Sequence, residues 1–359
     1  TIARAVEVAC HKDIIQLQAG TYAEYDITVN KGVTIQGAST ATTILENTSG
    51  AQTTKGCFNI TTGTNSAYVT LKNLTIKDYQ DDRGGAAVYT TKYFVAENVH
   101  FSGNTGGDGS LGGGAVLIKY SASTARTSTF TGCTFTNNTS ASTAGQNGGG
   151  GAINLSASSN GKDKMDLEIT SCTFTGNKTN SGNSTQDGGA IYTNEAGSIE
   201  IKKSKFYNNT SYDNGAAIYA RYSTSMIIEN SLVYENTATD NAAVYYYGTG
   251  GSLRNTTLAD NITSVDVSGL ANHGTSSQPG AVVAKNCIFW GNNFDEIDEG
   301  GPNSYHTITV SYSIVDKTAT QNNDFTDGGN NLTSDPLFTD PNGDDYSIQA
   351  LSPATNSGT

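Results

Sequence analysis

The sequence is poor in proline, tryptophan and charge. Among its 359 residues there are 5 prolines and 1 tryptophan, and charged residues make up 15 %. Soluble globular chains are usually about one quarter charged, and an amphipathic helix needs charged side chains along its outer face. A largely helical fold is therefore not expected. No stretch of about 18 apolar residues occurs, so we expect no transmembrane segment in this chain.

Positively charged residues are also few, and the cysteines lack the spacing of a metal site. The chain carries 20 Lys and Arg against 33 Asp and Glu, a net charge of −13. An acidic surface repels the phosphate backbone of nucleic acids, so no nucleic acid partner is expected. None of the five cysteines has the CxxC spacing of a zinc site. Clustered carboxylates could instead bind Ca²⁺, the one cofactor that the composition leaves open.

Glycine, serine, threonine and asparagine are abundant and form a repeat. One phrase consists of an aromatic or aliphatic residue, two variable residues and then asparagine. It occurs at Phe101–Asn104, Phe135–Asn138, Phe174–Asn177, Phe206–Asn209, Val233–Asn236, Leu258–Asn261 and Phe289–Asn292. The asparagines are roughly 25 to 39 positions apart, a spacing typical of solenoid proteins. We expect each asparagine to end a strand in the left-handed conformation and to hydrogen-bond to the asparagine of the next coil.

A second phrase alternates with the first and consists of two small residues, alanine and an aliphatic residue. It occurs at 113–116, 150–153, 188–191, 215–218 and 241–244, with a looser copy at 84–88. Residues two apart in a strand point to the same side. Three columns are therefore predicted to point into the coil. They are the aliphatic residue of this phrase, the aromatic residue of the first phrase, and the residue two positions before the aromatic one. In that last column, Cys133 and Cys172 would be neighbours, either as a disulfide or as buried free thiols.

These patterns predict an all-β fold, a right-handed parallel β-helix: a solenoid of about 10 coils that forms a single domain over residues 1–359. Ile2, Ala5, Val6 and Ala9 have helical spacing. Residues 1–12 are therefore predicted to be an N-terminal cap with a short helix. Residues 13–350 are predicted to form the coils, and residues 351–359 a tail that leaves the domain.

The motifs resemble those of a known superfamily. The opening DIIQLQAGTY…ITVNKGVTIQG resembles the first coils of pectate-lyase-like right-handed β-helix proteins, and the ending DPLFTDPNGDDYSIQALSPATNSG is similar to the close of many secreted β-helix domains. The alternating GGAI and FxxN phrases resemble the repeats of chlamydial polymorphic outer-membrane proteins and of adhesin-like surface proteins. The resemblance implies a secreted or cell-surface protein in a carbohydrate-rich setting. It lends no catalytic residues, because the motifs of polygalacturonases, pectate lyases and pectin methylesterases are missing.

An outward column of tyrosines is the first candidate site. The residue after the aliphatic one points outward, and it is Tyr192, Tyr219 and Tyr245 in three successive coils and Tyr89 in an earlier one. Tyr222 and Tyr247 lie nearby in the sequence. Exposed aromatic rings are good platforms for the C–H faces of sugars. Alternatively, the rings stack across coils only to stabilise the sheet.

A column of carboxylates precedes the same strands. Asp187, Asp213 and Asp240 lie in the turns before them. Carboxylate oxygens at the spacing of the coils could bind Ca²⁺, or these residues could be ordinary turn formers before glycine.

Three charged residues near these strands could also form a catalytic site. Arg221 follows Tyr219 by two positions and could act as the base of a lyase on an acidic sugar, with Asp213 nearby. Asp213 and Asp240 could be the carboxylate pair of a glycoside hydrolase. The alternative is that Arg221 is a packed surface residue that stacks on the tyrosines.

Three functions follow from these patterns. The leading hypothesis is an adhesin-like segment of a larger exported protein, monomeric within it, that binds a polysaccharide or a glycosylated surface through the tyrosine face. The second is a polysaccharide lyase or glycoside hydrolase on the same scaffold. The third is a structural stalk whose binding function lies elsewhere in a precursor.

Overall fold

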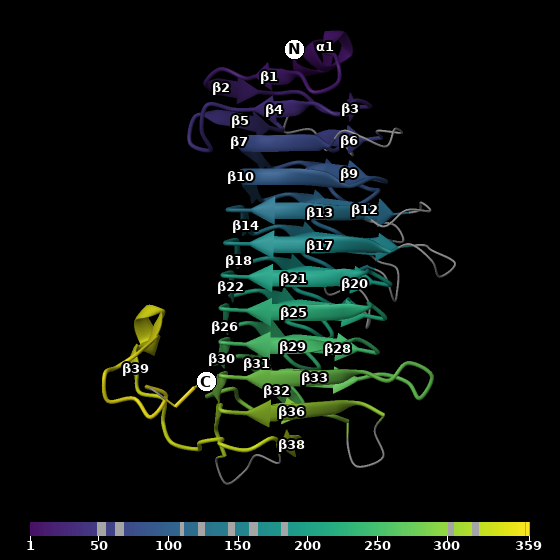
Figure 1. Cartoon of the computed structure of the whole chain (residues 1–359). Coiled ribbons are helices and arrows are strands. Elements are labelled where there is room, and N and C mark those ends of the chain that lie inside the picture. The colour runs from purple at the N-terminus through teal and green to yellow at the C-terminus, as the bar shows by residue number, and fades with distance from the viewer. Residues whose placement is uncertain are drawn as a thin grey trace.

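The chain winds into a stack of parallel β-coils with the α-helix α1 at one end (Figure 1). A 3-10 helix, η1 (Pro341–Gly343), lies near the other end of the sequence. The computed structural model describes residues 1–48, 55–61, 68–107, 111–120, 126–142, 148–157, 164–180, 186–300, 305–317, 323–355 and 357–358. Every pairing between strands is parallel except that of β39 (Phe338–Asp340) with β40 (Asp345–Ile348). The chain is thus a parallel β-helix, as the sequence predicts. Within the described residues, no helix has the length and apolar character needed to cross a membrane.

Sheet A is the largest of the three sheets that run along the stack, with 21 strands. Most coils contribute two strands to it, separated by a residue with positive φ such as Asn230 (φ 51°). Its strands are β1 (Ile14–Gln16), β2 (Gly20–Tyr22), β4 (Thr34–Gln36), β5 (Thr43–Glu46), β7 (Val69–Lys77), β10 (Phe94–Ser102), β13 (Arg126–Thr131), β14 (Thr134–Thr136), β17 (Met165–Thr170), β18 (Thr173–Thr175), β21 (Ser198–Lys202), β22 (Lys205–Tyr207), β25 (Ser225–Glu229), β26 (Leu232–Tyr234), β29 (Gly250–Arg254), β30 (Thr257–Ala259), β33 (Ala281–Lys285), β34 (Ile288–Trp290), β36 (Thr307–Ser311), β37 (Ile314–Val315) and β38 (Thr326–Asp327).

Sheets B and C complete each coil. Sheet B has ten strands, and its outer face carries the predicted tyrosines. Its strands are β3 (Ile27–Val29), β6 (Phe58–Ile60), β9 (Val88–Thr90), β12 (Val116–Tyr120), β16 (Ile153–Ala157), β20 (Ile191–Asn194), β24 (Ile218–Arg221), β28 (Val244–Tyr247), β32 (Val267–His273) and β35 (Asp295–Asp298). The seven two-residue strands of sheet C are β8 (Gln80–Asp81), β11 (Thr105–Gly106), β15 (Thr139–Ser140), β19 (Lys178–Thr179), β23 (Thr210–Ser211), β27 (Thr237–Ala238) and β31 (Ile262–Thr263).

The core is the interior of the coils, filled by columns of like residues. Phe101, Phe135, Phe174 and Phe206 stack with ring centroids 4.6 Å apart at each step. The column two residues earlier is buried as well, and all five cysteines are free thiols. These columns form because strand alternation points every second side chain inward and stacking brings equivalent positions together. The aliphatic column of the second phrase is buried too, so all three predicted columns are confirmed.

The asparagines of the first phrase form a continuous ladder of hydrogen bonds. From Asn104 to Asn292, each asparagine donates its backbone N–H (2.9–3.1 Å) and its Nδ2 (2.8–3.0 Å) to Oδ1 of the next. The predicted ladder is confirmed, but the predicted left-handed asparagine is wrong. The residue before each asparagine has φ between 51° and 72° instead. That residue takes the bend, so the asparagine side chain can point along the stack.

Helix α1 (Ile2–Val8) covers the first coil and confirms the predicted N-terminal cap. Its apolar side, Ile2 and Val6, packs on the core. The Thr1 side chain accepts a hydrogen bond from the Arg4 backbone N–H at 3.2 Å and thereby caps the helix. The cap closes an otherwise open end of the hydrophobic interior.

The parallel coils end earlier than the predicted residue 350. The last parallel bridge joins Ile314 with Leu332. Residues 335–355, here called the C-terminal strap, contain the antiparallel pair β39–β40 and lie beside the stack (Figure 1). Tyr346 of the strap packs on Tyr234 with ring centroids 4.7 Å apart. The strap thus covers apolar side chains on the outside of sheet A.

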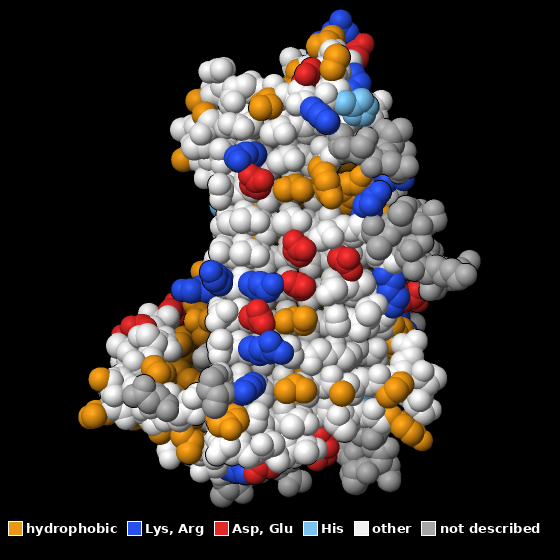
Figure 2. Space-filling model, viewed as in Figure 1, with side chains coloured by type: hydrophobic (Ala, Val, Ile, Leu, Met, Phe, Trp, Pro, Cys, Tyr) orange, Lys and Arg blue, Asp and Glu red, His pale blue; other side chains and the backbone are white. Residues whose placement is uncertain are grey.

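Charged side chains of both signs gather on the outer face of sheet A (Figure 2). They form ion pairs between or along strands, such as Lys72 Nζ with Glu97 Oε2 at 2.6 Å and Lys202 Nζ with Glu200 Oε2 at 2.7 Å. Such exposed pairs contribute little to stability. Because the charges alternate in sign, this face does not present a field of one sign to a ligand.

Candidate functional site

Three strands of sheet B place three tyrosines in one column. The register of β20, β24 and β28 sets Tyr192 beside Tyr219 and Tyr219 beside Tyr245. Their ring centroids are 5.7 Å and 5.1 Å apart, with planes 4° and 11° from parallel. The column lies outside the coil interior and forms an apolar cluster separate from the main core. We call these three residues the tyrosine column.

The tyrosine column is buried, contrary to the expectation of an exposed platform. The relative exposures of Tyr192, Tyr219 and Tyr245 are 0 %, 5 % and 5 %. The glycine-rich turns that precede the strands lie against the rings, so that a Cβ on Gly149 would be 3.0 Å from Tyr192 Cδ2. The sequence establishes that the rings point outward but not that turns cover them. Their stacking stabilises the sheet, and their flat faces are closed to a ligand.

Tyr222 and Tyr247 remain partly exposed beside the column. Their ring centroids are 5.4 Å apart, and the Arg221 guanidinium lies 4.6 Å from the centroid of the Tyr222 ring. Arg221 also hydrogen-bonds to Tyr192 and contacts Asn194 Oδ1 at 3.5 Å. Arg221 is thus stacked among aromatic rings, and no ion pair joins it to a carboxylate within the described residues.

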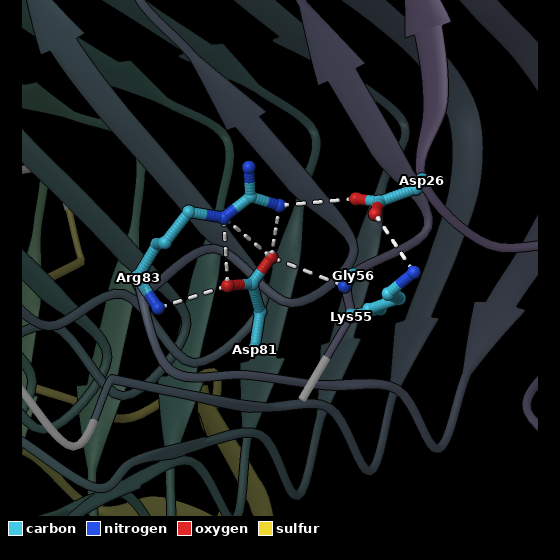
Figure 3. Close-up of polar contacts among 5 residues, drawn as sticks. All are labelled: Asp26, Lys55, Gly56, Asp81 and Arg83. Atoms are coloured by element: carbon cyan, nitrogen blue, oxygen red, sulfur yellow. Dashed lines mark hydrogen bonds and ion pairs between the residues drawn. The ribbon is translucent and has the colours of Figure 1, made fainter. Parts of the chain in front are cut away.

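The corner near the N-terminal end of the same face is held by a polar cluster from three successive coils (Figure 3). The Arg83 guanidinium donates hydrogen bonds to the buried Asp81 carboxylate from Nε (3.0 Å to Oδ1) and from a terminal nitrogen (2.6 Å to Oδ2). Asp81 Oδ2 accepts the Gly56 N–H at 3.1 Å. Asp26 pairs with Arg83 at 3.3 Å and with Lys55 at 3.7 Å. The cluster balances its charges internally and ties the coils together.

Tyr89, the tyrosine predicted in an earlier coil, does not extend the tyrosine column. Leu117 and Asn154 occupy the positions between Tyr89 and Tyr192. The Arg83 guanidinium lies 5.1 Å from the centroid of the Tyr89 ring. This cation–π contact occupies one face of the ring.

The predicted carboxylates stand in the turns that lead into β20, β24 and β28. Asp187 is buried and its Oδ1 accepts from Asn214 Nδ2 at 2.9 Å and from its N–H at 3.1 Å. Burial raises the pKa of Asp187 to about 6, although these hydrogen bonds lower it. Burial and the charges of Asp187 and Asp240 raise the pKa of Asp213 to about 7, and Asp213 hydrogen-bonds to Asp240. Asp213 therefore keeps its proton to a higher pH than an ordinary aspartate does.

The carboxylates do not form the predicted Ca²⁺ site. In the part of the chain that the structure describes, no group of three His, Cys, Asp or Glu side chains is placed to hold a metal ion. Asp187 uses Oδ1 for Asn214, and Asp213 and Asp240 bond to each other, which leaves few oxygens directed at a common point. The turn-forming interpretation accounts for Asp187.

A chain of polar side chains lies beyond the tyrosine column, where the sequence predicted no site. Tyr245 and His273 hydrogen-bond through the tyrosine hydroxyl and Nδ1 at 2.8 Å. His273 Nε2 in turn lies 2.5 Å from Asp298 Oδ2. The hydrogen bonds therefore fix the imidazole from both sides and connect three successive strands, β28, β32 and β35.

His273 also continues a second outer column. The register pairs Arg221 with Tyr247 and Tyr247 with His273. We call these three residues the second column. The signal was present in the sequence: Gly269 and Leu270 are a degenerate copy of the second phrase, and extending the register by one coil places His273 beside Tyr247.

A cavity of about 550 Å³ opens at the end of the second column. Its lining includes Asp266, His273, Asp298, Tyr305 and His306. Burial raises the pKa of Asp298, but the hydrogen bonds with His273 and the Gly300 N–H outweigh it, so its net pKa lies below the ordinary value. Burial and the neighbouring His273 lower the pKa of His306.

Comparison with known proteins identifies a repeat. Residues 132–156, 171–194 and 203–221 match the Chlamydia polymorphic membrane protein repeat. Each match begins next to the strand that carries the inward Phe and ends in a strand of sheet B, so the matched unit follows the coil. The matches cover less than half of the chain. No curated protein matches it.

Two solved structures are similar over most of the chain. Tailspike protein 3 of bacteriophage CBA120 has 13 % identity and a TM-score of 0.35 over 91 % of this chain. The PL6 family alginate lyase AlyGC has 11 % identity and a TM-score of 0.38 over 99 % of it. The chain spans 56 % and 57 % of the lengths of those chains. This protein is a parallel β-helix in which three segments match the Chlamydia polymorphic membrane protein repeat.

Proposed function

We propose that this chain is an adhesin-like segment of a larger cell-surface protein and that it binds a polysaccharide or a glycosylated surface. The polymorphic membrane protein repeat supports a surface location. The ligand lies on the outer face of sheet B, over the second column and the adjoining cavity. The tyrosine column lies beside the second column and contacts it through the Tyr247 ring.

The observation that carries the proposal is the combination of aromatic and polar groups along the second column. Arg221, Tyr247 and His273 stand on three successive strands, so they span roughly 10 Å at the usual strand spacing. The cavity lined by Asp298 and Tyr305 continues from them. Sugars need hydrogen-bonding groups for their hydroxyls and ring faces for their C–H surfaces. Both kinds of group are present here within reach of one short oligosaccharide.

Binding accounts for the geometry better than hydrolysis or elimination does. The two carboxyl groups of a glycosidase flank the scissile bond at about 5 Å or more, whereas Asp213 and Asp240 hydrogen-bond to each other. A lyase base must reach a substrate proton, whereas Arg221 packs against Tyr222 and Tyr192. A plain stalk would not need the polar cavity.

A glycan array tests this proposal. We expect the protein to bind one class of glycan and Tyr247→Ala to weaken that binding about ten-fold, because a stacked sugar loses its ring partner. Tyr305→Ala, at the 64 % exposed rim residue of the cavity, should have a similar effect. Tyr68→Ala, at an exposed tyrosine beside β7, is the matched control and should bind as the unmodified protein does.

The proposal is contradicted if Tyr247→Ala and Tyr305→Ala bind every glycan as strongly as Tyr68→Ala does. It is also contradicted if the unmodified protein binds no glycan on the array.

A further inference from the structure

A cavity of about 510 Å³ lies between the outer side of sheet A and the C-terminal strap. Its floor is one column of outer positions that follows four successive coils: Thr257, Ile288, Ile314 and Leu332. At the usual strand spacing these coils extend over about 14 Å. The cavity is therefore a groove along the stack, and its volume is in the range of pockets that hold small ligands. We call it the strap groove.

The two sides of the strap groove come from different parts of the chain. One side is a row of left-handed residues at the turns of successive coils, with φ between 49° and 59°: Asn255, Asn286, Tyr312 and Asn330. The other side is the strap, through Tyr346, Ser347 and Ile348. Hydrophobic side chains are visible where the strap meets the stack (Figure 2). Ile348 is 39 % exposed, so the strap leaves apolar surface open in the groove.

The aromatic rings of the groove have most of their faces in use. Lys285 Nζ lies over the Tyr312 ring, 5.1 Å from its centroid. Tyr346 packs against Tyr234 and Phe338, with ring centroids 4.7 Å and 5.2 Å apart, and it is 6 % exposed. A sugar would need an open ring face to stack on, whereas an alkyl chain needs only an apolar floor. The groove therefore suits an aliphatic group better than a sugar.

The charge beside the floor of the groove is positive. Among the described residues that line the groove, none is charged. Lys285 adjoins it, because Lys285 precedes Asn286 and lies over Tyr312, and both of these are in the lining. Within the described residues Lys285 forms no ion pair. Arg254, its neighbour in the register of sheet A, is well exposed and only 3.7 Å from Glu229. An anionic group at this side of the groove would thus meet an unpaired ammonium.

The carboxylates on the strap side already have partners. Asp345 accepts a hydrogen bond from the Ser347 N–H at 3.0 Å, and the charge of Lys205 acts on it. Asp260 accepts from the Tyr346 hydroxyl at 2.8 Å. Neither carboxylate is in the lining of the groove. They therefore leave the positive charge of Lys285 available to a ligand.

We propose that the strap groove binds a single-chain fatty acid, with its alkyl chain on Ile288, Leu332 and Ile348 and its carboxylate at Lys285. Burial of the chain on the apolar floor supplies most of the affinity. The carboxylate accepts a charge-assisted hydrogen bond from the ammonium group, which fixes the orientation of the chain. The site lies on sheet A, so it is separate from the proposed glycan site on sheet B and does not depend on it.

Calorimetric titration with three amphiphiles that share one chain tests the proposal. Decanoate, decanol and decylamine differ in the charge of the head group, and each is used below the concentration at which it aggregates. We expect decanoate to bind about ten-fold more tightly than decanol, because only decanoate gains the contact with Lys285. Decylamine should bind most weakly. General attraction to a chain of net charge −13 would give the opposite order.

Two variants separate the head-group contact from the apolar contact. Lys285→Met should weaken decanoate about ten-fold and leave decanol unchanged. Its matched control is Lys119→Met, at an exposed lysine in sheet B. Ile348→Ser should weaken both ligands about ten-fold, because it removes apolar surface from the groove. Its control is Ile262→Ser, at an isoleucine of sheet C that is 49 % exposed.

Three outcomes overturn the proposal. In the first, the unmodified protein binds no decanoate, or binds decylamine more tightly. In the second, Lys285→Met and Ile348→Ser bind decanoate as their controls do. In the third, sedimentation shows a dimer that Ile348→Ser disrupts, which assigns the groove to a second copy of the chain. All three leave the glycan proposal intact, since the array tests a different face.

Discussion

Glu296 takes the place that an asparagine fills in each coil before it. Asn292, the last asparagine of the ladder, donates its backbone N–H to Glu296 Oε1 at 3.2 Å and its Nδ2 to Oε2. The Glu296 side chain is fully buried. Burial raises its pKa well above the ordinary 4.5, although the hydrogen bonds from Asn292 lower it. The ladder thus ends on a carboxyl group whose neutral form the fold favours.

Because the pKa of Glu296 is raised, the direction in which stability changes with pH can be predicted. Above about 4.5 the unfolded chain loses the Glu296 proton while the folded protein retains it. The contribution of Glu296 to the free energy of unfolding is therefore largest at low pH and declines as pH rises through the folded pKa. We expect Glu296→Gln to be more stable than the unmodified protein at pH 8, and by less at pH 5, in urea unfolding. Glu168→Gln, at an exposed position in sheet A, should show no such difference; equal behaviour of the two variants would contradict the prediction.

At the residue scale, the tyrosines show that the direction of a side chain and its exposure to solvent have different causes. Strand alternation determines that Tyr192, Tyr219 and Tyr245 point away from the core. Their burial depends on turns that fold back over them. Tyr247, two positions after Tyr245 on the same strand, keeps part of its ring in solvent. The ligand contacts are therefore assigned to the second column.

Helix α1 shows how an element too short to be stable alone is held in place. Isolated helices of fewer than about 12 residues are marginal in water, and α1 has 7. Glu24 accepts the Ile2 N–H at 2.7 Å and the Ala3 N–H at 3.1 Å. Lys31 Nζ donates to carbonyl groups at the other end, including Glu7 O at 2.6 Å and Ala9 O at 2.8 Å. Opposite charges thus bind both ends of the helix dipole.

Lys31→Met should loosen α1 while the coils persist. The substitution keeps the apolar stem but removes the donors to three carbonyl groups of α1 and its C-terminal end. A loss of about 1–2 kcal/mol of local stability is expected. Hydrogen exchange of the α1 amides should accelerate about ten-fold or more. Lys119→Met, at an exposed lysine in sheet B, is the control, and an identical exchange pattern in both variants would show that Lys31 does not hold the helix.

At the scale of the whole molecule, the asparagine ladder ties together the coils from Asn104 to Glu296. Asn177 lies in its middle, where its Nδ2 donates to Phe135 O and to Asn209 Oδ1, each at 2.9 Å. Its Oδ1 accepts from the N–H of Asn138 at 3.1 Å and from its Nδ2 at 2.9 Å. The asparagine side chains are buried and have no access to solvent partners. Each coil therefore depends on its neighbours for polar satisfaction as well as for packing.

Asn177→Ala should lower the stability of the whole stack. It leaves several buried donors and acceptors without partners, at about 1–3 kcal/mol for each. A decrease of about 3 kcal/mol or more in the free energy of unfolding is expected. Thr175→Ala, at a partly exposed outward position of β18 in the same coil, should change it by less than about 0.5 kcal/mol. Urea midpoints measure both, and similar midpoints for the two variants would contradict a structural role for the ladder.

The sequence by itself determined the coil, its inward columns, the asparagine ladder and the helical cap. It could do so because strand alternation and stacking repeat one local rule in every coil. Tertiary structure decided which outward residues are accessible, because turns of unequal length cover some of them. It also joined Tyr245, His273 and Asp298 beside one cavity, and placed Tyr346 on Asp260, 86 positions away, at 2.8 Å. The repeat does not predict these contacts, because they depend on how segments outside the repeat pattern pack against the coils.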